Sequence, residues 1–345
     1  MKANYFLGDS RFELREVPVR ALRTGEVLVR VMAAGVCGTD VHIYHGEEGA
    51  TPVNPPVVLG HEYAGVVEAV GEGVTAVHPG DPVTIDPNMY CGMCAACREG
   101  KKQFCDHMTA LGVNFDGGFA QYCIAPQAQC LPLAPDVPFE VGALAEPVAC
   151  CLHGVDLANI RLGDAVLIIG GGAIGLIMAQ LARRAGAARV IVSEPVAYRR
   201  EIALKLGADG VIDPLHEDVR ARFDALTGRR GASVVIECVG HVAATRQAFD
   251  AAARGATLLL FSVPRPGATF DLPMMDVFKK ELTIRGSFVN PDTHSRAVEL
   301  INARCLNLAP LITHRFPLTR VEDAIKAQMG ADSIKVLVSP WMEEA

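Results

Sequence analysis

The sequence has no excess of positive charge. Its 345 residues include 32 lysines and arginines against 39 acidic residues, a formal net charge of −7 at pH 7. A balance of that sign gives no general attraction to nucleic acids or anionic membrane surfaces, so we expect neither as a partner. Repeats and low-complexity tracts are also lacking. With 21% charged and 50% hydrophobic residues, the composition is that of a globular protein with a sizeable core.

Apolar runs of membrane-spanning length are lacking as well. The first residues carry early charges and show no apolar stretch of a secretory signal. The most conspicuous apolar segment, Ala165–Ala179, is short for a bilayer and is interrupted by three consecutive glycines. An odd number of cysteines, eleven, favours a reducing compartment. We therefore expect a cytoplasmic protein without a membrane segment.

What is present divides into two patterns. The first half is β-rich: Glu26–Met32 alternates, Tyr63–Val70 resembles a strand, and glycine and proline punctuate the chain. Such spacing suggests a compact, barrel-like domain.

From about Arg161 onward, short apolar strands alternate with helical segments. The predicted strands are Ala165–Ile169, Arg189–Val192, Ser233–Cys238, Thr257–Val263 and Leu282–Phe288, and the predicted helices include Ile174–Ala185 and Val242–Ala253. This alternation is typical of an α/β doubly wound parallel sheet. A helix over Ser295–Arg304 and a strand over Ile334–Val338 are expected to end the chain.

A glycine fingerprint opens this second region. Gly170, Gly172 and Gly175 fit G-x-G-x-x-G, follow a predicted strand and open a predicted helix. Glu194 ends the next strand, about 20 residues further on, where such folds carry an acid. The glycines let the backbone approach a pyrophosphate, whose charge the helix N-terminus favours. The context therefore predicts a dinucleotide site rather than an empty glycine turn.

The acid at the end of that strand bears on the choice of dinucleotide. Glu194 would accept hydrogen bonds from the adenosine ribose and repel a 2′-phosphate, which favours NAD over NADP. Arg199 and Arg200 follow closely and offer charge to a 2′-phosphate, so NADP stays an alternative.

Four cysteines cluster in one short segment. Cys91, Cys94, Cys97 and Cys105 form C-x2-C-x2-C-x7-C, a spacing that suits a closed tetrahedral zinc site with a structural role. An iron–sulfur cluster is the main alternative, but the bacterial ferredoxin run places its fourth cysteine closer and follows it with proline.

A second metal site is suggested by residue types rather than by spacing. Cys37, His61, and the acids Glu62 and Glu146 offer a thiolate, an imidazole and carboxylates, which can hold zinc and leave a position for substrate. Taken singly, such residues are more often ordinary core or surface groups.

Cys37-Gly-Thr-Asp-x-His42, Gly60-His61-Glu62, the four-cysteine loop, Glu146-Pro147 and the glycine fingerprint follow one another along the chain. In this order they resemble the zinc-containing medium-chain dehydrogenase/reductase family, in its sorbitol (polyol), threonine and butanediol dehydrogenase-like branch, over essentially the whole chain. The resemblance implies a GroES-like catalytic domain over 1–154 and 290–345, a Rossmann NAD-binding domain over 155–289, an active site in the cleft between them, and a homotetramer or homodimer.

The resemblance also implies roles for individual residues. Cys37 and His61 match catalytic zinc ligands, and Glu62 and Glu146 match carboxylates that bind that zinc directly or stand just behind it. Asp40 would orient the ligating histidine. Thr39 and His42 would relay the substrate proton, by way of the cofactor ribose, to solvent. Positions at cofactor contacts are Ile174, Glu194, Arg199, Leu260, Phe261, Ser262, Ser287 and Phe288.

These matches predict an enzyme with NAD and two zinc ions per chain, one catalytic and one structural. We expect hydride transfer from a secondary alcohol of a polyol (a sugar alcohol or vicinal diol) to NAD, giving a ketose or hydroxyketone. The alternatives are an L-threonine 3-dehydrogenase and, less favoured, a non-catalytic nucleotide-binding relative. Animal sorbitol dehydrogenases, which the chain resembles elsewhere, have an Arg-Tyr pair at the position of Val289-Asn290. This difference counts against sorbitol itself as the substrate. Phe115 is a candidate for the substrate pocket.

Overall fold

The computed structural model describes residues 1–47 and 52–343. The chain forms two compact units: unit 1 comprises Met1–Ala149 and Val289–Ala345, and unit 2 comprises Cys150–Phe288. The chain therefore leaves unit 1, builds unit 2 and returns. The division into two domains, one over 1–154 and 290–345 and the other over 155–289, stays a prediction.

Unit 1 is built on a seven-stranded sheet around β3 (Glu26–Gly35). Alternate side chains of β3, including Val27, Val29 and Val31, are buried, as the period of a strand requires. β3 pairs with β5 (Glu62–Val70), β9 (Tyr122–Pro126) and β18 (Lys335–Ser339). The other strands of unit 1 are β1 (Lys2–Gly8), β2 (Arg11–Glu16), β4 (Val57–Val58), β6 (Pro82–Ile85), β7 (Asn88–Met89), β8 (Thr109–Ala110), β10 (Cys130–Pro132) and β17 (Ile312–Pro317).

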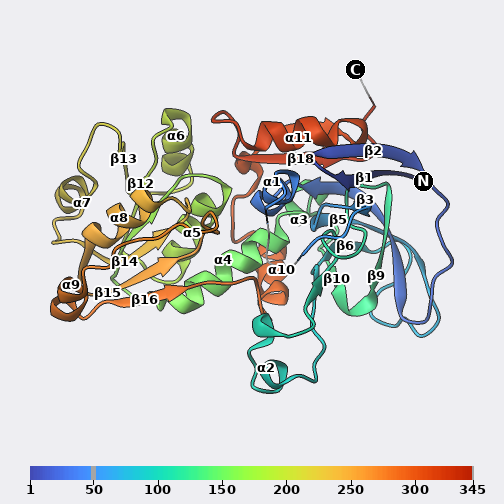
Figure 1. The fold of residues 1–345 in the computed structure, drawn as a ribbon, viewed down its shortest axis with the longest axis horizontal. Helices are drawn as coiled ribbons and strands as arrows, with labels where there is room; N and C mark the ends of the chain where they lie inside the picture. The colour runs from blue at the N-terminus through green and yellow to red at the C-terminus, as the bar shows by residue number, and fades with distance from the viewer. Residues whose placement is uncertain (48–51, 344–345) are drawn as a thin grey trace. The chain divides into compact units, whose positions relative to one another are not determined.

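The C-terminal segment completes this sheet. β18 lies antiparallel to β3, with Leu337 opposite Gly35, so the red end of the ribbon runs beside its blue beginning (Figure 1). This pairing brings Lys335, at the start of β18, to the residues that follow β3.

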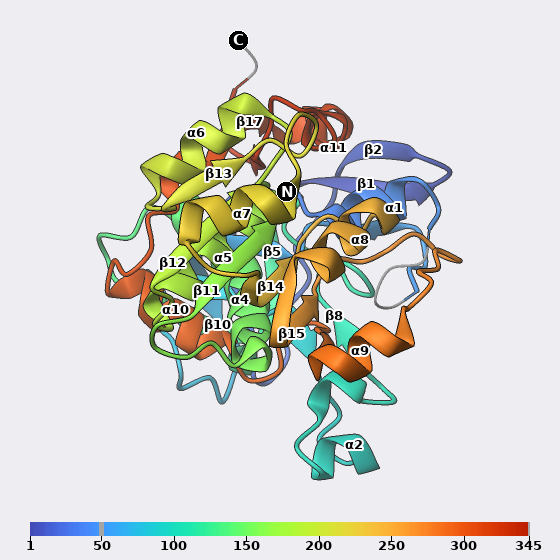
Figure 2. The same ribbon diagram turned by 90° about the vertical axis from the view of Figure 1, so that its left-hand side faces the viewer.

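Unit 1 also carries helices and a projecting segment. The helices are α1 (Gly38–Tyr44), α2 (Ala95–Arg98), α3 (Phe139–Gly142), α10 (His294–Asn302) and α11 (Val321–Gln328), with α4 (Ala145–Ala158) running on into unit 2. Short 3-10 turns cover Lys102–Phe104, Gln127–Gln129, Ala309–Leu311 and Leu318–Arg320. The segment with α2 projects away from the sheets of its unit in both views (Figures 1 and 2).

Unit 2 contains a six-stranded parallel sheet in the order β13-β12-β11-β14-β15-β16. Its strands are β11 (Ala165–Ile169), β12 (Arg189–Ser193), β13 (Gly210–Ile212), β14 (Ala232–Glu237), β15 (Ala252–Leu260) and β16 (Thr283–Gly286), and its helices are α5 (Ala173–Arg184), α6 (Ala197–Lys205), α7 (Val219–Thr227), α8 (Val242–Ala251) and α9 (Met274–Lys280). The predicted doubly wound α/β fold is confirmed. The strand order reverses between β11 and β14, and the carboxyl ends of the strands at such a point are where these sheets bind ligands.

The elements match the sequence expectations closely where the apolar pattern is strong. β11 is as predicted, and all five of its residues are buried. β15 begins earlier than the expected Thr257, because a register shift and Gly255, at φ +72°, bend the strand without ending it. β16 is shorter than the expected Leu282–Phe288 and is exposed at every residue.

Among the described residues, one segment is long and apolar enough to cross a membrane by length and composition. It covers Phe139–Ala158, and 72% of its apolar window is buried inside the protein, as in a core helix. The segment singled out from the sequence, Ala165–Ala179, forms instead β11, the glycine turn and part of α5.

Candidate active site and metal centres

The glycine fingerprint forms the turn between β11 and α5. Gly170 has φ +98°, a conformation that L-residues rarely adopt. A Cβ at Gly175 would overlap the carbonyl oxygen of Gly170, so helix and strand can approach only without a side chain there. Gly172 caps the helix, and a Cβ there would meet no atom within 4 Å. The space in front of the helix N-terminus is thus open to a phosphate group.

Glu194 lies just after β12 with 3% of its surface exposed. Its Oε2 accepts a hydrogen bond from the Gly171 N–H at 2.6 Å, and its Oε1 accepts one from the Val196 N–H at 2.8 Å. These bonds fix the carboxylate beside the glycine turn. A carboxylate has about four acceptor positions, so ribose hydroxyls can still be accommodated.

The two arginines after Glu194 differ in their surroundings. Arg200 donates to the carbonyl oxygens of Glu194 and Pro195, at 2.8 and 2.7 Å, and pairs with Asp213 at 3.1 Å. It is therefore held by protein groups. Arg199, on α6, is partly exposed and is the arginine to consider for a 2′-phosphate.

The other predicted cofactor positions lie at strand and helix ends of unit 2. Leu260 ends β15, and its carbonyl oxygen accepts from the Ser287 N–H at 3.1 Å beyond β16. Phe261 and Ser262 follow β15, Phe288 follows β16, and Ile174 stands in the first turn of α5.

Glu237 is an acid that the sequence reasoning missed. It ends β14, is 2% exposed, and accepts from the Val239 and Gly240 N–H groups at 2.7 and 2.9 Å. Ser262 Oγ donates to its other oxygen at 3.2 Å. Glu237 thus shapes the loop at the reversal point much as Glu194 shapes the glycine turn. An acid closing a buried strand was the available signal.

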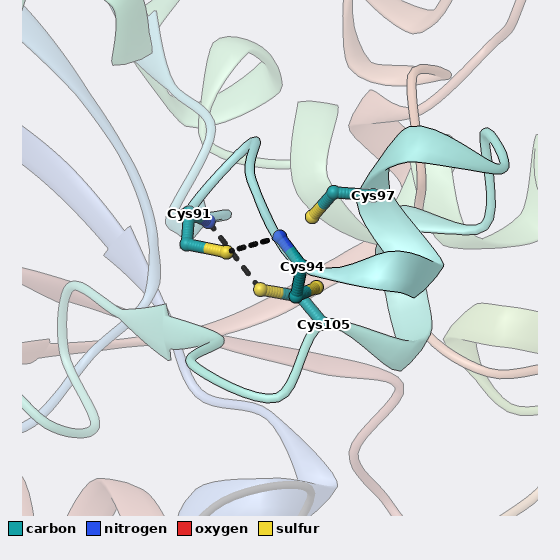
Figure 3. Close-up of side chains that lie close together, drawn as sticks. All are labelled: Cys91, Cys94, Cys97 and Cys105. Atoms are coloured by element: carbon teal, nitrogen blue, oxygen red, sulfur yellow. Dashed lines mark hydrogen bonds between the residues drawn. The ribbon is translucent and has the colours of Figure 1, made fainter.

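The four cysteines of the projecting segment converge (Figure 3). One sulfur from each of Cys91, Cys94, Cys97 and Cys105 lies within 4.8 Å of the others. Cys105 Sγ accepts from the Cys91 and His107 N–H groups, at 3.3 and 3.4 Å. Such backbone donors stabilise sulfur as thiolate, the form that binds metal.

The pKa values of these thiols differ from one to the next. Backbone N–H groups of Met93 and Cys94 lower the pKa of Cys91 to about 6, and those of Cys97 and Asp106 lower that of Cys94. Burial raises the pKa of Cys97 to about 12. Four converging thiols with such donors fit a tetrahedral zinc, whose charge favours all four thiolates.

Cys37, His61 and Glu62 form the second metal-binding geometry. Cys37 caps α1, Glu62 begins β5, and His61 immediately precedes it. One ligand atom from each lies within 4.8 Å of the others, and His61 and Glu62 are buried. A thiolate, an imidazole and a carboxylate so close together, away from water, fit a divalent cation.

Asp40 backs this cluster. It is fully buried, and its Oδ2 accepts from the Cys37 N–H at 2.8 Å. His61 Nδ1 lies 3.7 Å from Asp40 Oδ1, which leaves Nε2 as the ring nitrogen for a metal. Burial favours a neutral His61, but Asp40 and Cys37 outweigh it and raise the His61 pKa. This surplus of negative charge is what a bound cation would satisfy.

Lys335 is a second residue that the sequence reasoning missed. Its Nζ forms an ion pair with Glu62 Oε2 and donates to the Val36 carbonyl oxygen at 2.9 Å. Only 4% of Lys335 and 1% of Glu62 is exposed. Burial opposes its charge, but Glu62 and Cys37 outweigh that effect and raise the Lys335 pKa. A lysine within the apolar strand Ile334–Val338 was the available signal.

A small cavity of about 60 Å³ adjoins the cluster within unit 1. Thr39, His61 and Glu146 line it, together with Asn88 and apolar side chains. Glu146, in the first turn of α4, is 8% exposed. It thus reaches the same cavity as His61, although the tight cluster is made by Cys37, His61 and Glu62.

His42 lies on the same helix as Thr39 and is partly exposed. Its Nδ1 contacts the carboxylate of Glu47, which the sequence reasoning did not include. A carboxylate at Nδ1 fixes the proton there and leaves Nε2 as the acceptor, the arrangement a relay needs.

Phe115, the candidate for the substrate pocket, is not among the residues that line the Thr39 cavity, and its place in the pocket stays a prediction. Phe115 is 52% exposed and lines a separate hollow of about 460 Å³ with Tyr5, Arg23 and Tyr122. In its loop, Gly112 and Gly117 pack closely against the backbone of Gly60.

The fold and these residue clusters fit a nucleotide-binding oxidoreductase with metal sites, and known proteins match the chain in the same sense. The family described as alcohol dehydrogenase GroES-like domain matches residues 23–136, and the zinc-binding dehydrogenase family matches 173–303. An L-threonine 3-dehydrogenase of Caldanaerobacter subterraneus subsp. tengcongensis is 36% identical over 330 residues, 94% of each chain.

Solved structures agree with these matches. A protein of Sinorhizobium meliloti 1021, described as a zinc-binding dehydrogenase bound to NADP, is 38% identical with a TM-score of 0.93, covering 98% of this chain and 99% of its own. The 2R,3R-butanediol dehydrogenase of Bacillus subtilis is 27% identical with a TM-score of 0.89, covering 98% and 99%. The chain belongs to the zinc-dependent medium-chain dehydrogenase/reductase family and is an oxidoreductase.

Proposed function

We propose that the protein oxidises a secondary alcohol of a polyol, a sugar alcohol or vicinal diol, with NAD as hydride acceptor. The observation that carries the proposal is the cavity lined by Thr39, His61 and Glu146 beside the buried Cys37–His61–Glu62 cluster. Its volume of about 60 Å³ has room for a few non-hydrogen atoms, enough for a carbinol group and its neighbour.

Two zinc ions per chain follow from the two clusters. Cys37 and His61, with Glu62 or Glu146, would hold the catalytic ion, and Cys91, Cys94, Cys97 and Cys105 the structural one. When bound, the catalytic zinc makes a substrate hydroxyl more acidic, and the nicotinamide accepts hydride. Because Lys335 neutralises Glu62, the charges of Cys37 and Glu146 are left to balance a dication.

The chain's own groups position the substrate and move the proton. Asp40 orients His61. Thr39 Oγ1, at the cavity wall, would accept the proton of the substrate hydroxyl while donating its own toward His42. Glu47 holds the His42 ring, whose Nε2 passes the proton to solvent. The apolar part of the cavity lining excludes water from the reacting carbon.

NAD is favoured over NADP by Glu194. Its buried carboxylate, held beside Gly171, suits ribose hydroxyls and repels a 2′-phosphate, and Arg200 is occupied by carbonyl groups and Asp213. The contacts to NAD would come from Gly170, Gly172, Ile174, Gly175, Glu194, Arg199, Leu260–Ser262, Ser287 and Phe288. Reversal of the preference in Glu194→Ala, toward NADP, would support this assignment.

The alternative substrate is L-threonine, favoured by the 36% identity to threonine dehydrogenases. Side chains around the cavity argue against it: among the described residues that line it, Glu146 is an acid and none is lysine or arginine, so with His61 bound to zinc no side chain there would pair with an α-carboxylate. The test is a panel of polyols, vicinal diols and L-threonine with NAD and NADP, followed by the absorbance of the reduced cofactor. Activity on threonine alone would contradict the proposal.

A homodimer or homotetramer is part of the proposal. β16 is an edge strand exposed at every residue, and Met274, Met275 and Phe278 of the neighbouring α9 are 79%, 61% and 78% exposed. A second copy covering this face would bury that apolar surface.

Cytoplasmic location rests on the eleven cysteines, none of which forms a disulfide among the described residues. Cell fractionation tests this location, and light scattering tests the oligomeric state.

A further inference from the structure

The Thr39 cavity has one polar side chain that the reaction does not use. Apart from Thr39, His61 and Glu146, its lining is apolar except for Asn88. Asn88 lies in β7, three residues before the first cysteine of the four-cysteine segment, and is 8% exposed. A buried carboxamide on an otherwise apolar wall is costly unless its polar atoms have partners. Its partners therefore show what it can offer a ligand.

The backbone of Asn88 is fixed on both sides. Its N–H donates to Asp86 Oδ1 at 3.1 Å, and its carbonyl oxygen accepts from Gln129 Nε2 at 2.8 Å. The side chain is fixed as well, since Asn88 Nδ2 donates to Asn290 Oδ1 at 2.5 Å. Asn88 is thus a rigid part of the cavity wall, as a specificity residue must be.

Asn290 and His294 belong to the C-terminal segment that returns to unit 1. Their contacts determine the orientation of the Asn88 carboxamide. Both are 1% exposed. The Asn290 amide nitrogen faces His294 Nδ1 at 3.4 Å. With its nitrogen facing the His294 ring, Asn290 presents its oxygen to Asn88. Asn88 must then turn its own nitrogen toward Asn290, and Oδ1 is the atom it can offer to the cavity.

An acceptor at this place selects among substrates. With Asn88 Oδ1 and the Glu146 carboxylate, the wall accepts hydrogen bonds, and none of the described residues that line it is lysine or arginine. A hydroxyl next to the reacting carbinol can donate to Oδ1. An ether oxygen or a carboxylate at the same position would face a lone pair instead.

We propose that Asn88 is a specificity-determining residue of this cavity, that Asn290 and His294 position its carboxamide, and that the preferred substrate carries a second hydroxyl adjacent to the one oxidised. This inference rests on the proposed function, because it concerns the substrate of the same site.

Two matched pairs of alcohols test it with the wild-type, zinc-loaded full chain. 1,2-Propanediol and 2-butanol differ by a hydroxyl against a methyl group, and 1-methoxy-2-propanol and 2-pentanol differ by an ether oxygen against a methylene. We expect kcat/KM to be at least about tenfold higher for the diol than for 2-butanol, because a buried acceptor left unpaired penalises the analogue. We expect no gain for the ether over 2-pentanol. An equal gain for diol and ether, or no gain for the diol, would overturn the inference.

Variants test the residues. Asn88→Leu should reduce kcat/KM for 1,2-propanediol about tenfold more than for 2-butanol, mainly through KM. Asn290→Leu should shift the same ratio, and the double variant should lose no more than Asn88→Leu alone, whereas Asn290→Ser should restore part of the ratio. Asn302→Leu is the matched control: its amide holds the Ala134 N–H at 2.8 Å, on the same segment, and the ratio should not change.

The outcomes separate this inference from the proposed function. A wild-type enzyme that oxidises diols but keeps its diol preference in Asn88→Leu contradicts the inference alone. A wild-type enzyme that oxidises threonine and no diol contradicts both. Melting temperatures of the variants show which of them are folded, and the absence of a diol preference in the wild type overturns the inference whether or not the variants fold.

Discussion

The ammonium group of Lys335, from the last strand of unit 1, forms an ion pair with the carboxylate of Glu62, the residue that follows His61 and begins β5. Both side chains are almost fully buried, and the Val36 carbonyl oxygen accepts a further hydrogen bond from Lys335. The C-terminal segment therefore holds one of the two candidate zinc carboxylates in place.

Lys335→Met should leave Glu62 as an uncompensated buried charge. Loss of one partner from a buried pair costs about 3–5 kcal/mol, so the free energy of unfolding should fall by that amount in the metal-free protein. Urea unfolding measures it. Lys102→Met is the control, because Lys102 pairs with Asp292 at the surface and its loss should cost less than about 1 kcal/mol. Equal effects of the two substitutions would contradict the structural role of the buried pair.

Glu47→Gln should slow the reaction through His42. The carboxylate orients the ring that passes the proton to solvent, so we expect kcat to fall by roughly tenfold, and His42→Asn to lower it by about 100-fold. Steady-state kinetics as a function of pH measures both. In the His42→Asn background, Glu47→Gln should have no further effect, and an additive loss would show that Glu47 acts elsewhere.

Cys105→Ser should remove one metal ion per chain. Cys105 is one of four converging sulfurs, and a tetrahedral site that loses a thiolate binds zinc far more weakly. Elemental analysis of protein purified without chelators should give about two zinc for the wild type and about one for the variant. Cys130→Ser is the control, a buried thiol outside both clusters, which should keep both ions. One zinc in the wild type would contradict the catalytic metal site.

Asp86 and His294 should give opposite dependences of stability on pH. Burial raises the pKa of Asp86 from 3.8 to about 7, so the folded state binds the extra proton and stability falls as pH rises through that interval. Burial lowers the pKa of His294 from 6.5 to about 3, so the unfolded state binds the extra proton and stability rises with pH up to 6.5. The two effects, each on the order of 4 kcal/mol, largely cancel between about pH 4 and 6.5.

Single substitutions should separate the two effects. Asp86→Asn should leave a stability that rises steeply from about pH 3 to 6.5, and His294→Gln one that falls from about pH 4 to 7. Urea unfolding at a series of pH values measures both, with the wild-type curve flatter than either. Parallel curves for all three proteins would contradict the buried protonation states.

Local sequence determined the nucleotide fold and the four-cysteine cluster. Their information lies in short spacing: Gly170 to Gly175 and the strand before them, Glu194 at the end of the next strand, and the cysteines between 91 and 105. Residues so close along the chain can be arranged in only a few ways, so the sequence pattern nearly determines their geometry. Spacing does not distinguish Cys37, His61, Glu62 and Glu146 from the other cysteines, histidines and glutamates. Only the resemblance to the dehydrogenase family does.

Tertiary structure decided what joins distant segments. Lys335 reaches Glu62, and Asn290 and His294 reach Asn88 and Asp86, only because the chain returns from unit 2 and adds its last strand and α10 to unit 1. No local pattern encodes such pairs, because each depends on strand register and on how deeply a polar group is buried. The sequence is thus enough to predict a zinc- and nicotinamide-dependent class of enzyme. The cavity wall proposed to select the alcohol substrate forms only when the distant segments come together in the folded protein.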